Sequence, residues 1–257
     1  MEKKSTLIDD LAKNASNGRV GGFLASKIAQ TQLSNGTKKW IMFIWDIFYN
    51  LVLILGIVVI IRSFIMSPFR VSGPSMCNTL NYINEQCQQS DGEYIIINKL
   101  GYLNIFGWKI GEPQRGDVIV LQTPYNAEEY FIKRIIGLPG ETIRLQSGYV
   151  YVYNTNHPNG VKLNETYLNE ENQGNTHPLY KNYSEFTVPE GKYLTFGDNR
   201  THSSDSRSCL RDNLTGVGCE SPSMSPYLDK SLIQGKAAVA LWPIPRFLTG
   251  HEYKELE

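Results

Sequence analysis

Residues 40–66 read WIMFIWDIFYNLVLILGIVVIIRSFIM, and this apolar segment determines the architecture that we expect for the chain. No charged side chain occurs from Ile47 to Ile61, a stretch that spans about 22 Å as a helix. With its flanks the segment becomes long enough to cross a bilayer. Trp40 can lie at one interface and Arg62 at the other. We therefore predict a transmembrane anchor rather than a buried core helix.

Residues 1–39 read as a flexible tail rich in polar residues. The basic residues before the apolar segment are Lys3, Lys4, Lys13, Arg19, Lys27, Lys38 and Lys39. By the positive-inside rule this tail lies in the cytoplasm, and the chain from residue 67 onward lies outside. A cleavable signal peptide fits less well, because the apolar run begins late and no A-x-A site follows it.

Beyond the anchor, short runs rich in Val, Ile and Tyr alternate with Gly and Pro turns, which is typical of strands. We predict one mostly β domain of hairpins and long loops over residues 67–257. Within it, the Asn-rich residues 157–183 are expected to form an insertion or exposed excursion. The expected strands are Glu93–Asn98, Val118–Gln122, Tyr130–Ile136, Thr142–Leu145, Tyr149–Tyr153, Tyr193–Phe196 and Ala237–Trp242.

The composition excludes several classes of function. The 257 residues carry 25 basic and 25 acidic side chains, so the chain lacks the net positive charge of a nucleic-acid-binding protein. It also contains no dinucleotide fingerprint, no phosphate loop and no zinc-type spacing of His and Cys. We therefore expect no nucleic-acid partner, no cofactor and no metal.

The four cysteines form two local pairs, Cys77 with Cys87 and Cys209 with Cys219. Each pair is ten residues apart, a spacing that suits a small closed loop and not a C-x-x-C redox or zinc motif. An oxidising compartment favours two local disulfides. Four reduced, partly buried thiols are the alternative, and the spacing does not decide between them.

The run Gly197-Asp198-Asn199-Arg200-Thr201-His202-Ser203-Ser204-Asp205-Ser206-Arg207 is dense in charged and hydroxyl side chains. Such a segment is typical of a buried polar network in which each donor and acceptor has a partner. Networks of this kind hold catalytic groups in position. A solvated polar turn is the alternative.

Ser75 and Lys133 are the candidate reactive pair. Ser75 lies shortly after the anchor, and a serine nucleophile needs a base within hydrogen-bond reach. Lys133 lies in the apolar run Tyr130–Ile136, where strand alternation places it with Phe131 and away from Arg134. Apolar surroundings lower the pKa of a lysine from its usual value near 10.4. The alternatives are His202 as base and Ser223 as nucleophile.

Taken together, these segments resemble type I signal peptidase, the bacterial leader peptidase, which is a membrane-anchored Ser/Lys protease. The resemblance extends from the anchor to about residue 246 and rests on blocks that occur in the family's order. The blocks are residues 73–80 (GPSMCNTL), 115–120 (RGDVIV), 133–141 (KRIIGLPGE), 197–207 and 233–237 with Trp242-Pro243.

The resemblance implies a role for each matching residue. Ser75 would attack the scissile carbonyl, and Lys133 would act as general base and then as general acid. Ser203 would hydrogen-bond the Lys133 amine. The other supporting positions are the pair Asp198 and Arg134, the pair Asp205 and Arg207, and Gly73 and Met76 of the nucleophile block.

The resemblance also implies the substrate and the setting. The substrate would be an exported preprotein with small residues at −3 and −1, cut at the surface of the bacterial cytoplasmic (inner) membrane. The enzyme would contact the lipid bilayer and, transiently, the secretion translocon. A related Ser/Lys protease with another substrate, or an inactive peptide-binding module, are the alternatives.

Two positions depart from the family's pattern. Asn78 stands where a proline is usual, which frees φ and restores a backbone N–H. Gly73 stands where some members carry a serine that contributes to the oxyanion hole. The oxyanion would then depend mainly on the Ser75 backbone N–H.

Overall fold

The computed structural model describes residues 34–248 apart from 78, 103, 106, 107, 110, 181, 182, 211–217 and 220–223. The chain divides into two compact units at Ile60 and Ile61. The first unit contains helix α3 (Asn35–Ile60), whose start is capped by Ser34 Oγ, an acceptor for the Thr37 N–H at 3.3 Å.

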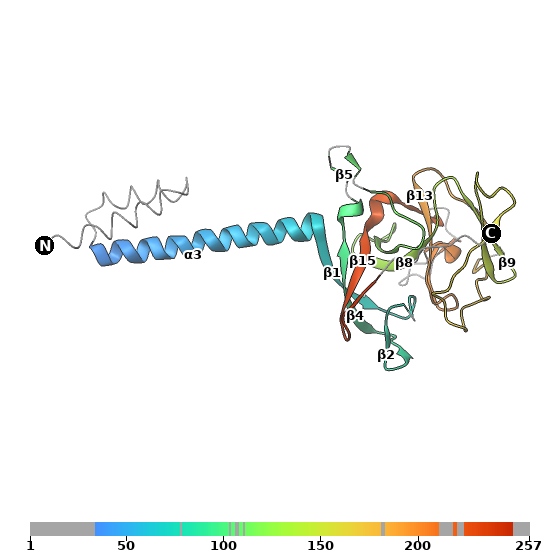
Figure 1. Cartoon of the computed structure of the whole chain (residues 1–257), viewed down its shortest axis with the longest axis horizontal. Helices are drawn as coiled ribbons and strands as arrows, with labels where there is room; N and C mark the ends of the chain where they lie inside the picture. Colours follow the sequence, from blue (N-terminus) through green and yellow to red (C-terminus); the bar gives the residue numbers. More distant parts are fainter. Residues whose placement is uncertain are drawn as a thin grey trace. The chain divides into compact units, whose positions relative to one another are not determined.

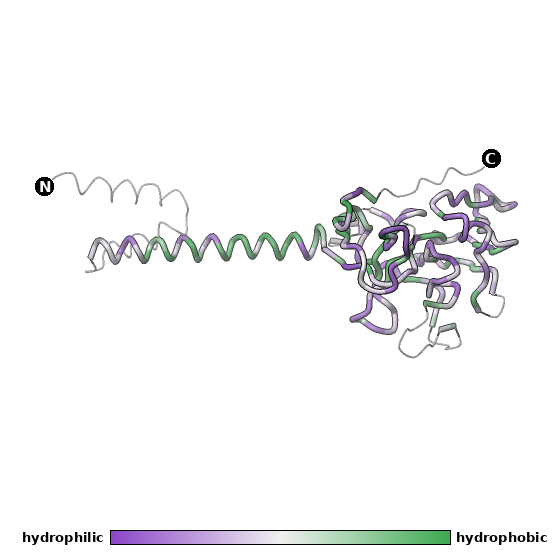
Figure 2. The backbone as a smooth tube through the Cα atoms, turned by 90° about the horizontal axis from the view of Figure 1, so that it is seen from below, coloured by the Kyte–Doolittle hydropathy of each residue, from purple (hydrophilic) through white to green (hydrophobic). Residues whose placement is uncertain are grey.

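Helix α3 is hydrophobic along most of its length (Figure 2), and its large apolar side chains are exposed. The chain continues through a single π-helical turn, η1 (Ile61–Ile65). The helical segment Gly36–Ile65 is long and apolar enough to cross a bilayer. It therefore fits the predicted single span, although it starts before Trp40 and ends just before Met66.

The second unit is built on an eight-stranded antiparallel sheet (Figure 1). Seven of the strands lie in the order β1-β4-β15-β7-β8-β13-β14, and the eighth, β16, pairs with β15. Its strands are β1 (Met66–Ser72), β4 (Asp91–Asn98), β7 (Val118–Gln122), β8 (Tyr130–Gly137), β13 (Lys192–Phe196), β14 (Tyr227–Asp229), β15 (Ile233–Trp242) and β16 (Arg246–Phe247).

A four-stranded antiparallel sheet with the order β11-β10-β9-β12 and two small hairpins complete the unit. The strands of this sheet are β9 (Thr142–Gln146), β10 (Tyr149–Tyr153), β11 (Val161–Lys162) and β12 (Glu185–Thr187). The hairpins pair β2 (Tyr82–Ile83) with β3 (Gln86–Cys87) and β5 (Asn104–Ile105) with β6 (Trp108–Lys109). The short 3-10 helices are η2 (Leu100–Tyr102), η3 (Ser206–Ser208) and η4 (Lys230–Leu232).

Strand β8 is buried along most of its length and takes part in separate apolar clusters. Ile132 packs with β1, β4 and β15, whereas Ile135 and Ile136 pack in two other clusters. Lys133 and Arg134 are consecutive residues of β8, so their side chains point to opposite faces of the sheet. The strand thus delivers one buried cation to each face of the sheet.

The predicted fold class is confirmed, since the described part of the second unit is mostly β. Each of the seven expected strands is present, and Val118–Gln122 and Tyr149–Tyr153 have the expected bounds. Strand β1 was not expected, because Met66–Ser72 follows the apolar helix directly and contains Pro68. Proline is tolerated there because β1 is an edge strand.

The described part of residues 157–183 is only partly exposed. Leu163 and Leu168 are buried, and Leu163 belongs to the core of the four-stranded sheet. Glu165 and Thr176 are buried as well, and both contact Arg200 of the polar run. The segment packs against that run because Arg200, fully enclosed, needs a carboxylate partner. The expectation of an insertion stays a prediction.

Both cysteine pairs form disulfides in the structure, Cys77–Cys87 and Cys209–Cys219. The first bridge joins the chain just after Ser75 to the end of the β2–β3 hairpin. It closes a short loop next to the predicted nucleophile. Of the two alternatives, the disulfides are therefore the ones observed.

Candidate active site

Ser75 lies in a tight turn directly after the edge strand β1. Gly73 leaves the strand with a φ of +81°, a conformation that favours glycine, and the Cys77 N–H closes the turn on the Pro74 carbonyl at 2.9 Å. Met76 is buried in the same apolar cluster as Val71 of β1. The turn is therefore anchored in the core on both sides of Ser75.

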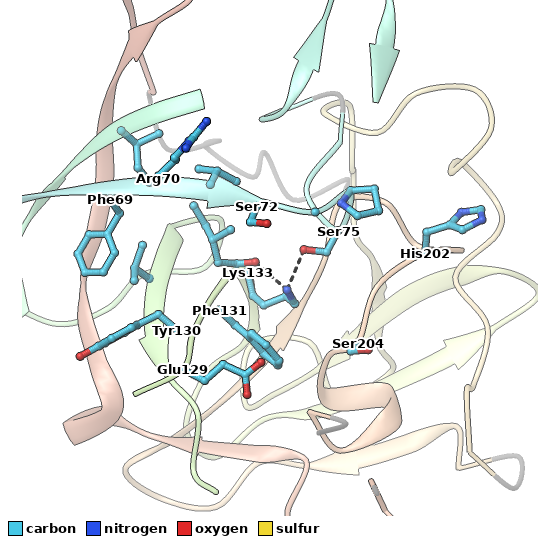
Figure 3. A pocket seen from close by; sticks show the side chains of 16 residues that line it. Phe69, Arg70, Ser72, Ser75, Glu129, Tyr130, Phe131, Lys133, His202 and Ser204 are labelled. Atoms are coloured by element: carbon cyan, nitrogen blue, oxygen red, sulfur yellow. Dashed lines mark hydrogen bonds between the residues drawn. The ribbon is translucent and has the colours of Figure 1, made fainter. Parts of the chain in front are cut away.

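Lys133 of β8 reaches this turn. Its Nζ donates to Ser75 Oγ at 2.9 Å and to the Ile132 carbonyl at 2.9 Å, and Figure 3 shows the two side chains pointing toward each other. Only 3% of Lys133 is exposed. The Phe131 ring lies 4.9 Å from Nζ on the same face. The side chain is therefore enclosed beside a hydroxyl.

Burial lowers the pKa of Lys133 to about 8. The carboxylates of Asp205 and Asp198 act in the opposite direction and raise it, while Arg207 lowers it further. Desolvation outweighs the two carboxylates because the amine is enclosed. Near neutral pH the amine consequently exists in both protonation states.

Asp198 and Arg134 form a buried, two-pronged ion pair. Arg134 Nε donates to Asp198 Oδ1 at 2.8 Å and Nη2 donates to Oδ2 at 2.6 Å, with side-chain exposures of 3% and 1%. Thr79 Oγ1 donates to the same carboxylate at 2.5 Å. The pair thus links β8 and the polar run to the turn that carries Ser75.

Asp205 and Arg207 form a second buried pair within the polar run. Arg207 Nη2 donates to Asp205 Oδ2 at 2.7 Å, and neither side chain is exposed. The Gly197 N–H donates to the same oxygen at 2.9 Å. Burial opposes the charge on Asp205, but Arg207 and the backbone N–H donors together lower the pKa of this carboxyl below its usual range. Asp205 thereby joins the start of the polar run, at Gly197, to its end, at Arg207.

Asn199 joins the polar run to the Ser75 turn through two hydrogen bonds. Its backbone N–H donates to the Ser75 carbonyl at 3.0 Å, and its Nδ2 donates to the Pro74 carbonyl at 3.1 Å. Asp198, Asn199, Arg200, Asp205 and Arg207 are all buried, so the run is a buried polar network, but Ser203 Oγ and Arg207 Nη1 have no hydrogen-bond partner among the described residues.

The expected bond between Ser203 and Lys133 is not formed. Ser203 Oγ is buried and has no hydrogen-bond partner among the described residues. The Lys133 amine instead donates to Ser75 and Ile132. Ser203 packs against Gly197, where a Cβ would lie 2.1 Å from its Oγ. Ser203 therefore lies beside the polar network, as expected, but it lacks the expected hydrogen bond to Lys133.

The alternative base, His202, is exposed at the edge of the cavity. Its Nδ1 lies 2.9 Å from Thr201 Oγ1, whereas Ser75 Oγ accepts from Lys133 (Figure 3). Two positions singled out in the sequence lie outside the described residues: Ser223, the alternative nucleophile, and Asn78, which stands where the family usually has proline.

A cavity of about 420 Å³ opens beside Ser75 and Lys133. One wall is the edge strand β1, with Phe69 to Ser72, and the other is the start of β8, with Tyr130 to Lys133. The lining also includes Ile95 and Val120, which belong to the same apolar cluster as Val71. Among the described residues, no further strand pairs with the outer edge of β1 or with the first half of β8, so an extended peptide can pair with either.

Sequence reasoning missed the residues that enclose Arg200 and Arg134. Arg200 Nη2 donates to Glu165 Oε1 at 2.5 Å and to Tyr167 Oη at 3.0 Å. The same Tyr167 ring stacks on the Arg134 guanidinium at 3.9 Å. No local motif marks Glu165 or Tyr167, because their partners are about 35 residues away along the chain.

The sequence is similar to those of known proteins over most of its length. The family model described as signal peptidase, peptidase S26, matches residues 44–242. Signal peptidase I of Bacillus licheniformis is 32% identical over 183 residues, covering 70% of this chain and 86% of that protein. Signal peptidase IB of Staphylococcus aureus is 30% identical over 207 residues, covering 74% and 85%.

Among solved structures, the crystal structure of a signal peptidase I from Enterococcus faecalis V583 is 30% identical and has a TM-score of 0.34, covering 49% of this chain and 97% of that one. The family model spans the end of the apolar helix, the Ser75 turn, β8 and the polar run. The chain therefore belongs to the peptidase S26 family of signal peptidases.

Proposed function

We propose that the chain is a membrane-anchored serine endopeptidase that removes signal peptides from exported preproteins, with Ser75 as nucleophile and Lys133 as general base. The observation that carries the proposal is the 2.9 Å contact between Lys133 Nζ and Ser75 Oγ in an enclosed site. Family membership supports the reaction class.

The reaction follows from this contact. The neutral Lys133 amine takes the proton of Ser75 Oγ as the oxygen attacks the scissile carbonyl, and the Ser75 N–H stabilises the oxyanion. The resulting ammonium then protonates the leaving amine, which is the new N-terminus of the mature protein. Water, deprotonated by Lys133, then attacks the acyl-enzyme. The Lys133 ammonium returns the proton to Ser75 Oγ as the ester bond breaks, and the signal peptide leaves as a carboxylic acid.

The remaining residues support this pair. The Asp198–Arg134 pair links the polar run to the segment that follows Ser75, and the Asp205–Arg207 pair fixes the shape of the run itself. Gly73 and Met76 shape the turn itself. The resemblance assigns Ser203 as an acceptor for the Lys133 amine; in the structure Ser203 is buried next to Gly197 and makes no hydrogen bond with that amine.

The setting is part of the proposal. Residues 1–39 lie in the cytoplasm, residues 40–66 cross the bacterial cytoplasmic membrane, and residues 67–257 lie outside. The basic residues before the apolar helix support this orientation. The two disulfides suit an oxidising exterior. A transient contact with the secretion translocon rests on the resemblance alone.

The function is tested with a purified preprotein that has Ala at −3 and −1, mixed with the full chain in detergent micelles. We expect one cut after the −1 Ala, identified by sequencing the mature N-terminus. A preprotein with Phe at −1 should stay uncut, because the resemblance implies a requirement for small residues at −3 and −1. Cleavage elsewhere would favour another Ser/Lys protease, and binding without cleavage would favour a peptide-binding module.

The rate should depend on pH through Lys133. Because the base acts in its neutral form and its pKa is about 8, kcat/KM should fall about tenfold per pH unit below 8 and level off above it. Initial rates between pH 6 and 10 measure this profile. A single inflection near 6.5 would instead indicate a histidine base such as His202.

A further inference from the structure

The turn that carries Ser75 is held from two sides. The polar run holds it on one side through Asn199. On the other side, Asn81 Nδ2 donates to the Gly73 carbonyl at 3.0 Å, two residues before Ser75. Asn81 is fully buried and adopts a φ of +62°. The second support has no place in the catalytic scheme above.

Asn81 is in turn locked to Glu93 of β4 by a reciprocal pair of hydrogen bonds. The Asn81 N–H donates to Glu93 Oε2 at 2.9 Å, and the Glu93 N–H donates to Asn81 Oδ1 at 2.8 Å. Gly92 allows this approach, since a Cβ there would lie 2.0 Å from Asn81 Oδ1. Glu93 is only 1% exposed, so its carboxylate needs a cation.

Arg246 of β16 supplies that cation. Its Nη2 donates to Glu93 Oε2 at 2.8 Å and to the Thr79 carbonyl at 3.0 Å, while Nη1 contacts Glu93 Oε1. The strand is fixed by pairing with β15, in which Arg246 faces Ala240, and by the Leu248 N–H on the Ala238 carbonyl. Arg246 therefore contacts the Ser75–Asn81 segment directly and through Glu93.

We propose that Arg246 is a positioning residue for Ser75, acting through Glu93 and Asn81 on the Gly73 end of the turn. The inference rests on the proposed function, because it assumes that Ser75 reacts. Arg246 lies beyond the residues that the family model matches, which end at 242. The C-terminal hairpin thereby becomes part of the machinery that sets the attack geometry.

The test compares R246M, R246K and the double variant E93Q/R246M with the wild type, all as full chains in micelles. A misplacement of about 1 Å at a reacting atom costs on the order of 100-fold in rate. We expect R246M to lower kcat by about 10- to 100-fold with KM within about twofold of wild type. R246K, which keeps the positive charge but not the two-pronged guanidinium, should recover part of kcat.

The double variant separates positioning from charge burial. R246M leaves the Glu93 carboxylate without its cation, whereas E93Q/R246M leaves an amide that still accepts from Asn81. We expect the melting temperature of E93Q/R246M to return toward that of wild type, because no unpaired carboxylate is buried. Its kcat should nevertheless stay as low as that of R246M. The matched control is R144M, which breaks the half-exposed Arg144–Glu185 pair of the four-stranded sheet and should leave kcat unchanged.

Each outcome decides the matter. A kcat of R246M within twofold of wild type, or a double variant with wild-type kcat, would overturn the positioning role. A loss of kcat that merely follows the unfolded fraction would also overturn it. If wild type cleaves the preprotein, these results bear on Arg246 alone; if wild type does not cleave, the proposed function fails together with the inference.

Discussion

Lys133→Met is expected to lower kcat/KM for preprotein cleavage by about 10³-fold or more while leaving the protein folded. Removing a general base costs about 10²- to 10⁴-fold, and here the same group also serves as general acid. Methionine fills a similar volume and carries no charge, so the enclosed site beside Phe131 should accept it.

The matched control for this variant is Lys192→Met. Lys192 lies on β13 of the same sheet, and its amine pairs with Asp229 in a partly exposed position. Exposed pairs contribute little, so both rate and melting temperature should stay close to wild type. The comparison is made by initial-rate kinetics and thermal unfolding in the same detergent. A Lys133→Met protein that keeps more than a tenth of wild-type kcat/KM would contradict the role of Lys133.

Arg134→Met is expected to destabilise the protein by about 3–5 kcal/mol, because it leaves the Asp198 carboxylate buried without its cation. The same substitution at Arg144, whose pair with Glu185 is half-exposed, should leave the stability close to that of wild type. Denaturant unfolding followed by tryptophan fluorescence compares the two variants.

A double variant makes this stability prediction sharper. Adding Asp198→Asn to Arg134→Met removes the buried charge and should recover part of the lost stability, since Thr79 still has an acceptor. Equal losses for Arg134→Met and Arg144→Met would show that the buried pair does not stabilise the fold.

The longer strands could be predicted from the sequence because local patterns determine them. Tyr149–Tyr153 alternates along a hairpin with turn residues at Ser147 and Gly148, and the structure gives the same bounds. Strand β1 could not be separated from the apolar helix by pattern, since its first residue continues the apolar run. Two-residue strands such as β11 are too short to show any periodicity.

The site was predictable where its residues lie in compact blocks. Ser75, Lys133 and the polar run each stand within a short motif, and the alternation of β8 separates Lys133 from Arg134. The roles of Glu165 and Arg246 were not predictable from the sequence. Each pairs with a residue far along the chain, 35 residues away for Glu165 and 153 residues away for Arg246. The predicted bond between Ser203 and Lys133 is not formed, because the Lys133 amine donates to Ser75 and Ile132 instead, an arrangement that the sequence does not reveal.

The most direct test of the central claim is the cleavage of one preprotein by wild type, Ser75→Ala and Ser72→Ala under identical conditions. Ser72 lines the same cavity three residues earlier and serves as the matched control. We predict a single cut after the −1 Ala by wild type and by Ser72→Ala, and no cut by Ser75→Ala at any enzyme concentration. Cleavage at that bond by Ser75→Ala would contradict the assignment of Ser75 as nucleophile.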